Sequence, residues 1–401
     1  MAQLTAIVNG KLVTPHSVIR DGVVLIEGDM IVACGPRGTV AIPVQAEVID
    51  AEGLYVGPGF IDIHCHGGGG CWSWEDPYRF ALAHMKHGTT GILPTMVYNQ
   101  SREDMYEGVR NVLEVMDAAD KPYRTAIVGI HMEGPYINNK YGAITSPIRP
   151  VDPDEYEALL TLAGDRIKVW TMAPELDGQR EFAEAASRYG IALSVGHSEA
   201  DAETIFSFVP KGLKIGCHCT NASGTTPSPS RFGGTREVGV DEAVLVHDDI
   251  YAEVIPDAGG IHVRPLMCKL ILKAKGVHRV IIITDAMPEA GLPQNPDTDK
   301  GVEFGGAVYH DVKFIEGLGL SGSKLTMDQA VRNMMNHTGA GMVEAFIMAS
   351  LNPAKVLKID HQAGSLEKGK RANLVIVNDS IEVRRVIFEG REVNFGEVES
   401  K

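Results

Sequence analysis

Two histidines one residue apart end an apolar run in the segment VGPGFIDIHCHGGGG, which spans residues 56–70. Side chains alternate between the two faces of a β-strand, so His64 and His66 would share one face and Cys65 would lie on the other. Imidazole nitrogens are common ligands of divalent transition ions. The pattern therefore predicts a pair of metal ligands at the end of a buried strand.

Four further segments place a residue of metal-ligand type at the end of an apolar run. They are VGIHMEGP with Glu133, ALSVGHSE with His197, KIGCHCTNA with His218, and RVIIITDAMP with Asp285. One such residue needs no functional explanation, whereas six at the same end of successive strands indicate one metal centre. Alternation places the neighbouring cysteines, Cys65, Cys217 and Cys219, toward the helices and predicts a structural role for them.

Neutral imidazoles and carboxylates suit Zn²⁺, with Fe²⁺ and Mn²⁺ as alternatives. Such an ion lowers the pKa of a bound water toward about 7 and polarises a carbonyl group. Asp285 is then the candidate general base, which afterwards protonates a leaving amine. The predicted chemistry is hydrolysis of an amide or a related C–N bond.

Between residues 56 and 357, short apolar runs alternate with amphipathic stretches, as in TAIVGIHMEGP, DEYEALLTLAG and IKVWTMAPE. Apolar strands that alternate with helices are typical of a parallel sheet buried on both faces. We therefore predict an α/β fold, a (β/α)₈ barrel of the TIM type, in which the strand ends carry the site.

The two ends of the chain, residues 1–55 and 358–401, carry β-branched residues between turn signals such as Asn-Gly and Gly-Pro. Such segments are typical of short strands. We predict that residues 1–55 and 358–401 form the two parts of one small β-sandwich domain beside a barrel at 56–357.

The chain of 401 residues has a formal net charge of −15, and this acidic field opposes binding to nucleic acid or anionic membranes. We expect neither partner. The first residues lack a basic region followed by a long apolar run, so we expect no signal peptide. Six cysteines without a CxxC pair predict no disulfide framework and a reducing cytoplasm.

These motifs resemble the amidohydrolase superfamily and, within it, the N-acetylglucosamine-6-phosphate deacetylases. The similar segments follow one another over nearly the whole chain: PGFIDIHCHGGGG, HMEGPYIN, GHSEA, HCTNAS, ITDAM and LSGSKLTM. The resemblance implies metal-dependent hydrolysis of the N-acetyl group of an amino sugar, with N-acetylglucosamine 6-phosphate giving glucosamine 6-phosphate and acetate. Members of this family usually pair, so it also implies a homodimer.

The resemblance further implies roles for single residues. One ion would be held by Glu133, His197 and His218, and a second by His64 and His66, which gives one or two ions per subunit. Asp285 would be the acid and base at the metal. The implied substrate-binding residues are Ala143, Asn221, Ala222, Arg236, His262, Leu320 and Ser321.

Three departures from the family pattern lie in the substrate loops. Ile144, in KYGAITSP, stands where the family usually has a histidine. The stretch after Asn221 is longer than usual and offers Arg231 as well as Arg236 for the substrate phosphate. The segment PDAGGIH, which ends in His262, has one additional residue. A different or unphosphorylated amino sugar therefore stays open as the substrate.

Two other interpretations also stay open. A cyclic-amide hydrolase of the dihydroorotase or hydantoinase type would need a carboxylated lysine on a later strand, and Lys168 in RIKVWTMAPE is the candidate. A catalytically inactive relative would be expected to have lost metal ligands, and all six are present.

Overall fold

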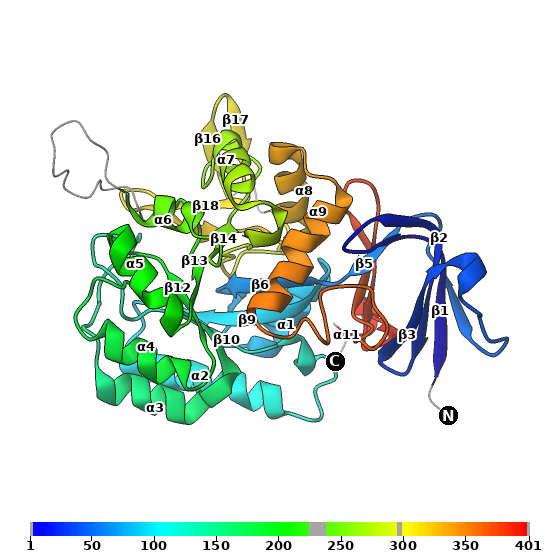
Figure 1. Cartoon of the computed structure of the whole chain (residues 1–401), viewed down its shortest axis with the longest axis horizontal. Coiled ribbons are helices and arrows are strands. Elements are labelled where there is room, and N and C mark those ends of the chain that lie inside the picture. The colour runs from blue at the N-terminus through cyan, green and yellow to red at the C-terminus, as the bar shows by residue number, and fades with distance from the viewer. Residues whose placement is uncertain (1–2, 224–237, 295–298, 399–401) are drawn as a thin grey trace.

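The computed structural model describes residues 3–223, 238–294 and 299–398. Two eight-stranded sheets lie side by side along the long axis of the molecule (Figure 1). One sheet forms a barrel, and the other, the terminal sheet, is assembled from both ends of the chain. The described residues include no helix with the length and apolar character needed to cross a bilayer.

The barrel sheet consists of eight parallel strands in sequence order, each followed by a helix. The strands are β6 (Phe60–Cys65), β9 (Thr89–Met96), β10 (Ile130–Glu133), β11 (Ile167–Met172), β12 (Ala192–Val195), β13 (Leu213–Gly216), β14 (Tyr251–Val254) and β15 (Val280–Ile282). The helices that follow them are α1 (Pro77–Met85), α2 (Arg102–Asp117), α3 (Pro153–Ala163), α4 (Gln179–Ser187), α5 (Ala202–Phe208), α6 (Val240–Val246), α7 (Pro265–Lys275) and α8 (Met327–Thr338).

The barrel closes where its first and last strands meet. The backbone amide of Asp285 donates to the carbonyl of His64 at 2.9 Å, and the amide of His66 donates to the carbonyl of Ala286 at 2.9 Å. A parallel bridge also pairs Cys65 with Ala286. This closure brings Asp285 beside the two histidines of the first strand.

The strands are apolar because both of their faces are covered, and all eight residues of β9 are buried. Several barrel helices begin at residues whose side chains cap the first turn. Side chains of Asp76, Ser101 and Asp201 each accept a hydrogen bond from the backbone amide three residues further on. These caps satisfy amides that the first helical turn leaves without partners. Local sequence thus sets where these three helices start.

The terminal sheet has the strand order β22-β21-β20-β5-β1-β2-β3, with β4 paired to β1. The two chain ends join where β20 pairs with β5 in antiparallel fashion. Both faces of β1 are covered, because Ile7 and Leu12 belong to one apolar cluster and Ala6 and Val8 to another. Its strands are β1 (Leu4–Val13), β2 (Val18–Glu27), β3 (Met30–Pro36), β4 (Glu47–Asp50), β5 (Tyr55–Pro58), β20 (Leu374–Val377), β21 (Val383–Phe388) and β22 (Arg391–Glu392).

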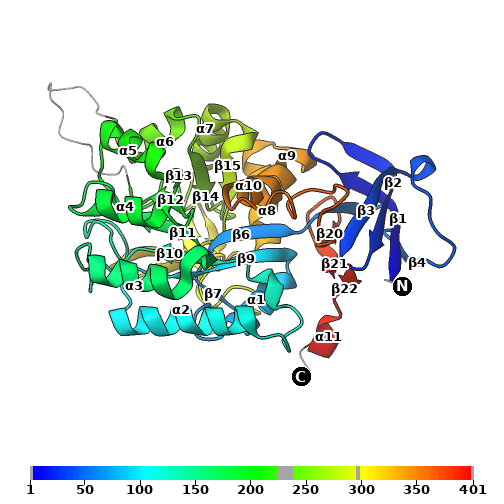
Figure 2. The ribbon, with the colours of Figure 1, turned by 60° about the horizontal axis from the view of Figure 1, so that its bottom comes forward.

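The predicted fold class, a TIM-type barrel with a small β domain from both termini, is confirmed. The strands that were predicted to form a β-sandwich belong to one eight-stranded sheet. The exact division at residues 55 and 357 stays a prediction. Figure 2 shows β6 running from the terminal sheet into the barrel, so the beginnings of the barrel strands face this sheet.

The remaining elements lie in the connections after β6 and β15 and at the end of the chain. They are the pairs β7 (Gly67–Gly68) with β8 (Cys71–Trp72), β16 (Val302–Phe304) with β17 (Ala307–Tyr309), and β18 (Val312–Ile315) with β19 (Gly319–Ser323), and the helices α9 (Met342–Phe346), α10 (Asn352–Val356) and α11 (Phe395–Val398).

Candidate active site

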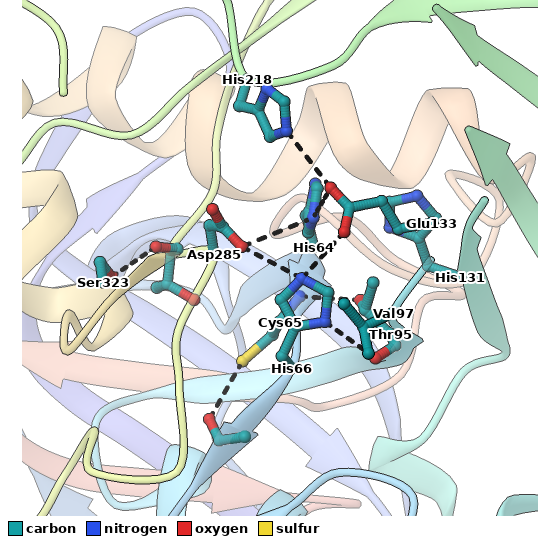
Figure 3. Close-up of polar contacts among 12 residues, drawn as sticks. His64, Cys65, His66, Thr95, Val97, His131, Glu133, His218, Asp285 and Ser323 are labelled. Carbon is teal, nitrogen blue, oxygen red and sulfur yellow. Dashed lines mark hydrogen bonds and ion pairs between the residues drawn. The ribbon is translucent and has the colours of Figure 1, made fainter. Parts of the chain in front are cut away.

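All six predicted metal ligands lie at the carboxyl ends of barrel strands. His64 is in β6 and Glu133 is the last residue of β10, whereas the other four follow their strands by one to three residues. None of the six is more than 8% exposed. The barrel therefore brings together side chains that are far apart in the sequence (Figure 3).

Three of these residues have a left-handed backbone: His197 and Asp285 with φ of 49° and His218 with φ of 24°. This conformation is uncommon outside glycine and costs on the order of 1–3 kcal/mol for each residue. Such strain persists only where the surrounding structure holds it, and it is concentrated at active sites.

The first group of ligand atoms consists of Glu133, His197 and His218. Glu133 Oε1 lies 3.0 Å from His197 Nε2 and 3.3 Å from His218 Nε2. The two Nε2 atoms are 3.1 Å apart. Three potential donors to one ion thus lie within a single small volume.

The second group consists of His64, His66 and Asp285. Asp285 Oδ1 lies 3.2 Å from His66 Nε2 and 3.6 Å from His64 Nε2. Glu133 joins this group to the first, because its Oε1 is 3.3 Å from His64 Nε2 and its Oε2 is 3.3 Å from His66 Nε2. Figure 3 shows the carboxylate of Glu133 between the histidines.

In three of these histidines, the second ring nitrogen, Nδ1, faces a backbone carbonyl. The pairs are His197 Nδ1 with Tyr141 at 3.2 Å, His218 Nδ1 with Asn221 at 3.1 Å, and His66 Nδ1 with Thr95 at 3.1 Å. A carbonyl oxygen only accepts, so each Nδ1 carries a proton, and a neutral ring then has its lone pair on Nε2.

Nitrogen lone pairs and carboxylate oxygens therefore converge on the same space. The buried Nε2 of His64 has no hydrogen-bond partner among the described residues. Electron pairs at these distances repel one another unless a positive charge lies between them. Imidazole and carboxylate donors suit a divalent transition ion, so these residues fit such a metal.

The carboxylates make the site attractive to positive charge, and their effect on the pKa of His66 shows it. Burial lowers the pKa of His66, but contacts with Asp285 and Glu133 outweigh it and raise the pKa to about 9. Burial raises the pKa of Glu133, yet the charges of His64 and His197 hold it well below its ordinary value. An ionised carboxylate is the form that binds a metal ion.

Glu253, in β14, is a further buried carboxylate at the site, and it was missed in the sequence. Its Oε2 lies 3.4 Å from His64 Nδ1 and accepts the backbone amide of His218 at 3.3 Å. A carboxylate on the far nitrogen of a ligand histidine fixes the ring and raises its basicity. The local sign of a buried carboxylate is a glutamate within the apolar run YAEVI, but nothing nearby in the sequence indicates its partners.

The prediction that the cysteines beside His218 face the helices is wrong for Cys217. Its Sγ lies 3.7 Å from His64 Nδ1 and 3.8 Å from the hydroxyl of Thr171, inside the barrel. Strand β13 ends at Gly216, so strand alternation no longer applies to the residues that follow. Cys217 therefore supports a ligand histidine from the interior.

A cavity of about 230 Å³ opens onto the ligand atoms. Asp285 and His66 lie in its wall, so the space for an ion and the space for a substrate are continuous. Arg236 and its alternative Arg231 lie outside the described residues. The other six predicted substrate-binding residues all line the cavity: Ala143, Asn221, Ala222, His262, Leu320 and Ser321.

Two polar atoms of the cavity residues, Asn221 Oδ1 and His262 Nε2, are buried without a partner in the described chain. His262 Nδ1 lies 3.2 Å from Asp257 Oδ2, and the Asp257 carboxylate also accepts the amides of Ile261 and His262. Burial raises the pKa of Asp257, but these contacts keep it below its ordinary value. The ionised Asp257 accepts a hydrogen bond from Nδ1 of His262, so it fixes the orientation of the ring in the cavity wall.

Tyr98 lies in the cavity wall and is a further residue that the sequence did not single out. The centroid of its ring lies 4.9 Å from that of His197, and its hydroxyl meets the backbone of Ala143 and Ile144. No local pattern marks Tyr98, because its position depends on loops from two distant parts of the chain. The Ile144 side chain is 41% exposed and is not among the described lining residues.

Lys168 lies away from this site, as the second residue of β11 and thus near the strand's beginning. Glu133 already occupies the position between the two ligand groups. Both observations count against the cyclic-amide hydrolase, which needs a carboxylated lysine among the metal ligands.

A closed parallel barrel with histidines and carboxylates at one mouth is the architecture of metal-dependent hydrolases. Residues 55–393 match the model of the Amidohydrolase family, and the chain belongs to this family. It is a metal-dependent hydrolase, as predicted.

Individual relatives show which members of the family the chain resembles. The N-acetylglucosamine-6-phosphate deacetylase of Bacillus subtilis (strain 168) is 32% identical over 97% of this chain and 97% of its own. The N-acetylgalactosamine-6-phosphate deacetylase of Escherichia coli O157:H7 is 30% identical over 96% of this chain and 98% of its own. The predicted resemblance to amino-sugar phosphate deacetylases is confirmed.

A solved structure supports the same conclusion. The crystal structure of N-acetylglucosamine-6-phosphate deacetylase from Pasteurella multocida has a TM-score of 0.83 and 29% identity. The match covers 97% of this chain and 99% of that chain, so it includes the terminal sheet as well as the barrel.

Proposed function

We propose that the protein hydrolyses the N-acetyl group of N-acetylglucosamine 6-phosphate to give glucosamine 6-phosphate and acetate. The observation that carries the proposal is the convergence of two ligand groups on Glu133, beside a cavity lined by six of the seven predicted substrate-binding residues. Near full-length relatives whose names state this reaction support it.

For the metal, we propose that Glu133, His197 and His218 hold one divalent ion. His64, His66 and Asp285 would hold a second, with Glu133 shared between the two. Zn²⁺ is our first choice, with Fe²⁺ and Mn²⁺ as alternatives. When bound, such an ion polarises a carbonyl group and lowers the pKa of water toward about 7.

Asp285 is the proposed proton carrier. Hydrolysis forms a C–O bond at the acetyl carbon and breaks the C–N bond, so a proton must leave the water and reach the nitrogen. Asp285 lies in the cavity wall, and contacts with His66 and His64 lower its pKa despite its burial. An ionised Asp285 can accept the first proton and return it to the departing amine.

His262 is the proposed donor to the acetyl oxygen, where negative charge develops during the reaction. Asp257 orients its ring through the contact with Nδ1. Asn221 has an unpartnered Oδ1, while its Nδ2 donates to the carbonyl of His262 at 2.9 Å. Asn221 is therefore held in place to accept a hydrogen bond from a sugar hydroxyl.

We propose that Arg236 binds the phosphate group of the substrate, with Arg231 as the alternative. None of the described residues that line the cavity is a lysine or an arginine. The identity of the sugar also needs a direct test, because relatives named for two different hexosamines match the chain at 32% and 30% identity.

The test is a substrate panel. N-acetylglucosamine, N-acetylgalactosamine and N-acetylmannosamine, each with and without a 6-phosphate, are incubated with metal-loaded protein while acetate release is followed. We expect the highest kcat/KM for N-acetylglucosamine 6-phosphate. A preference for unphosphorylated sugars would show that the substrate carries no 6-phosphate. If none of the six sugars releases acetate, the protein is not a deacetylase of these sugars. Elemental analysis of the same sample identifies the ion and its stoichiometry.

We also propose a homodimer located in a reducing cytoplasm. All six cysteines are free, and Leu266 and Leu270 on α7 expose 79% and 50% of their surface. Exposed apolar side chains on one helix suit an interface between subunits. Light scattering should give twice the chain mass of 43.2 kDa, and a monomer mass at micromolar concentration would contradict the proposal.

A further inference from the structure

A second cavity, here called the basal cavity, has a volume of about 280 Å³ and lies at the beginning of the barrel strands. Its walls come from β9 and β11, from residues around the start of β6, and from residues 359–373, which lead from the barrel to β20. Its volume is close to the lower limit of ordinary small-molecule sites, about 300 Å³. The polar side chains in its wall are Thr90, Thr125, Lys168, Gln362, Arg371 and Asn373.

The charge in this wall is positive. Lys168 and Arg371 are its charged residues, and no described aspartate or glutamate lines it, although the whole chain has a net charge of −15. Arg371 is partly neutralised by Glu389 at 3.3 Å and Asp29 at 3.7 Å, and Glu389 also accepts a hydrogen bond from the hydroxyl of Thr125 at 2.7 Å. Neither acid is among the residues that line the cavity. Lys168 has no ion pair with any residue that the structure describes.

The stem of Lys168 is held in place by the close approach of Gly129. A Cβ atom at Gly129 would lie only 2.3 Å from Lys168 Cγ, so the lysine stem packs directly on the glycine backbone. The contact holds the lysine stem at Cγ, and the side chain lines the cavity.

Neutral donors accompany the two cations. Asn373 Oδ1 accepts the backbone amide of Glu389 at 2.8 Å, so the NH₂ group of Asn373 remains a donor. The hydroxyl of Thr90 and the amide of Gln362 add two further polar groups to the wall. Such groups suit the oxygens and hydroxyls of a small polar ligand.

We propose that the basal cavity binds the phosphate group of a small phosphate compound. A phosphate monoester carries a charge of about −1.5 to −2 at neutral pH and three acceptor oxygens, which matches one ammonium and one guanidinium group. Arginine can hold two phosphate oxygens at once, whereas lysine acts as a point charge. Inorganic phosphate and a sugar phosphate present the same chemistry, and the experiment below separates them.

This site is independent of the proposed function, since none of its residues lines the active-site cavity. A ligand held by Lys168 and Arg371 would connect β11 of the barrel to the segment that leads into the terminal sheet. Binding should therefore stabilise the folded chain against heat.

The experiment measures the Tm of full-length, metal-loaded protein with inorganic phosphate, with glucose 6-phosphate, or with chloride at the same ionic strength. Glucose 6-phosphate has no acetamide group, so it is not deacetylated. We expect a rise in Tm of about 3 °C at a ligand concentration near one hundred times Kd. The active site can also bind glucose 6-phosphate, so the part of each Tm rise that Lys168→Met removes measures binding at the basal cavity. The phosphate with the larger part is the ligand, and no such part with either phosphate overturns the proposal.

Lys168→Met tests the location, because methionine keeps the stem that packs on Gly129 and removes the charge. The part of the Tm shift that comes from the basal cavity should disappear, while the kcat/KM for deacetylation stays unchanged. Lys214→Gln is the matched control, since Lys214 is likewise the half-buried second residue of its strand, β13. Lys168→Arg, which keeps the charge, should retain the shift. Equal shifts in Lys168→Met and the unmodified protein would place the phosphate elsewhere and overturn the proposal.

Discussion

The two ends of the barrel differ in charge and in the way they are built. The mouth at the carboxyl ends of the strands gathers histidines and carboxylates, whereas the basal cavity has Lys168 and Arg371 and no described acid. Most of the ligands at the mouth follow the ends of their strands, where the backbone is irregular. At the base, side chains within the strands meet the segment that returns to the terminal sheet.

Because of this difference, we expect the mouth of the barrel to determine the reaction and the opposite end to determine the stability of the fold. Loops at the mouth can change without disturbing the sheet, and active sites of such barrels lie at that end. The base is covered by packed chain, so changes there should alter stability before they alter the reaction. Four substitutions test this separation.

Asp285→Asn at the mouth should have the largest effect. Removing the proton carrier should lower kcat/KM by about 10²–10⁴-fold, with the melting temperature nearly unchanged. At least one ion should remain bound, because Glu133, His197 and His218 are untouched. Steady-state kinetics with elemental analysis checks both, and an active Asp285→Asn variant would contradict the assigned role.

Glu253→Gln should weaken metal binding by about 10–100-fold, since the amide no longer provides a charge on the far side of His64. Competition with a chelator measures this affinity. Activity should return at excess metal, which distinguishes the variant from Asp285→Asn. An unchanged chelator sensitivity would show that Glu253 does not support the ligand.

Tyr98→Phe removes the hydroxyl that meets the backbone of Ala143 and Ile144 and keeps the ring against His197. One hydrogen bond of about 0.5–1.5 kcal/mol corresponds to a rise in KM of roughly 2- to 10-fold. kcat and metal content should stay the same. A loss confined to kcat would mean that Tyr98 acts on the reaction and not on the substrate loop.

Asn352→Ala tests the end of the barrel where the strands begin. Asn352 is fully buried, and its Nδ2 donates to the carbonyls of Val277 and Val280 at 2.7 Å each. Leaving these carbonyls unpaired should lower the free energy of unfolding by about 1–3 kcal/mol, with kcat/KM within twofold. Lys355→Ala, at an exposed position of the same helix, is the control and should change neither quantity. A folded Asn352→Ala variant with tenfold lower activity would contradict the claim that this end of the barrel affects stability and not the reaction.

Most of the fold and the main ligand set could be predicted, because local patterns encode them. Apolar runs that alternate with amphipathic stretches indicated the barrel, and strand-end histidines and acids indicated the metal centre. The error at Cys217 arose because alternation was extended past Gly216, where β13 ends. Glu253 and Tyr98 were missed because their partners come from distant segments.

The sequence by itself determined the kinds of elements and the chemical types at their ends, since hydrophobic periodicity and turn residues act over a few neighbours. Tertiary structure alone decided that Glu253 lies beside His64 and that Asp257 orients His262. It also brought Lys168 and Arg371 to one cavity at the base. Those arrangements depend on barrel closure and on the pairing of the two chain ends, which join residues hundreds of positions apart.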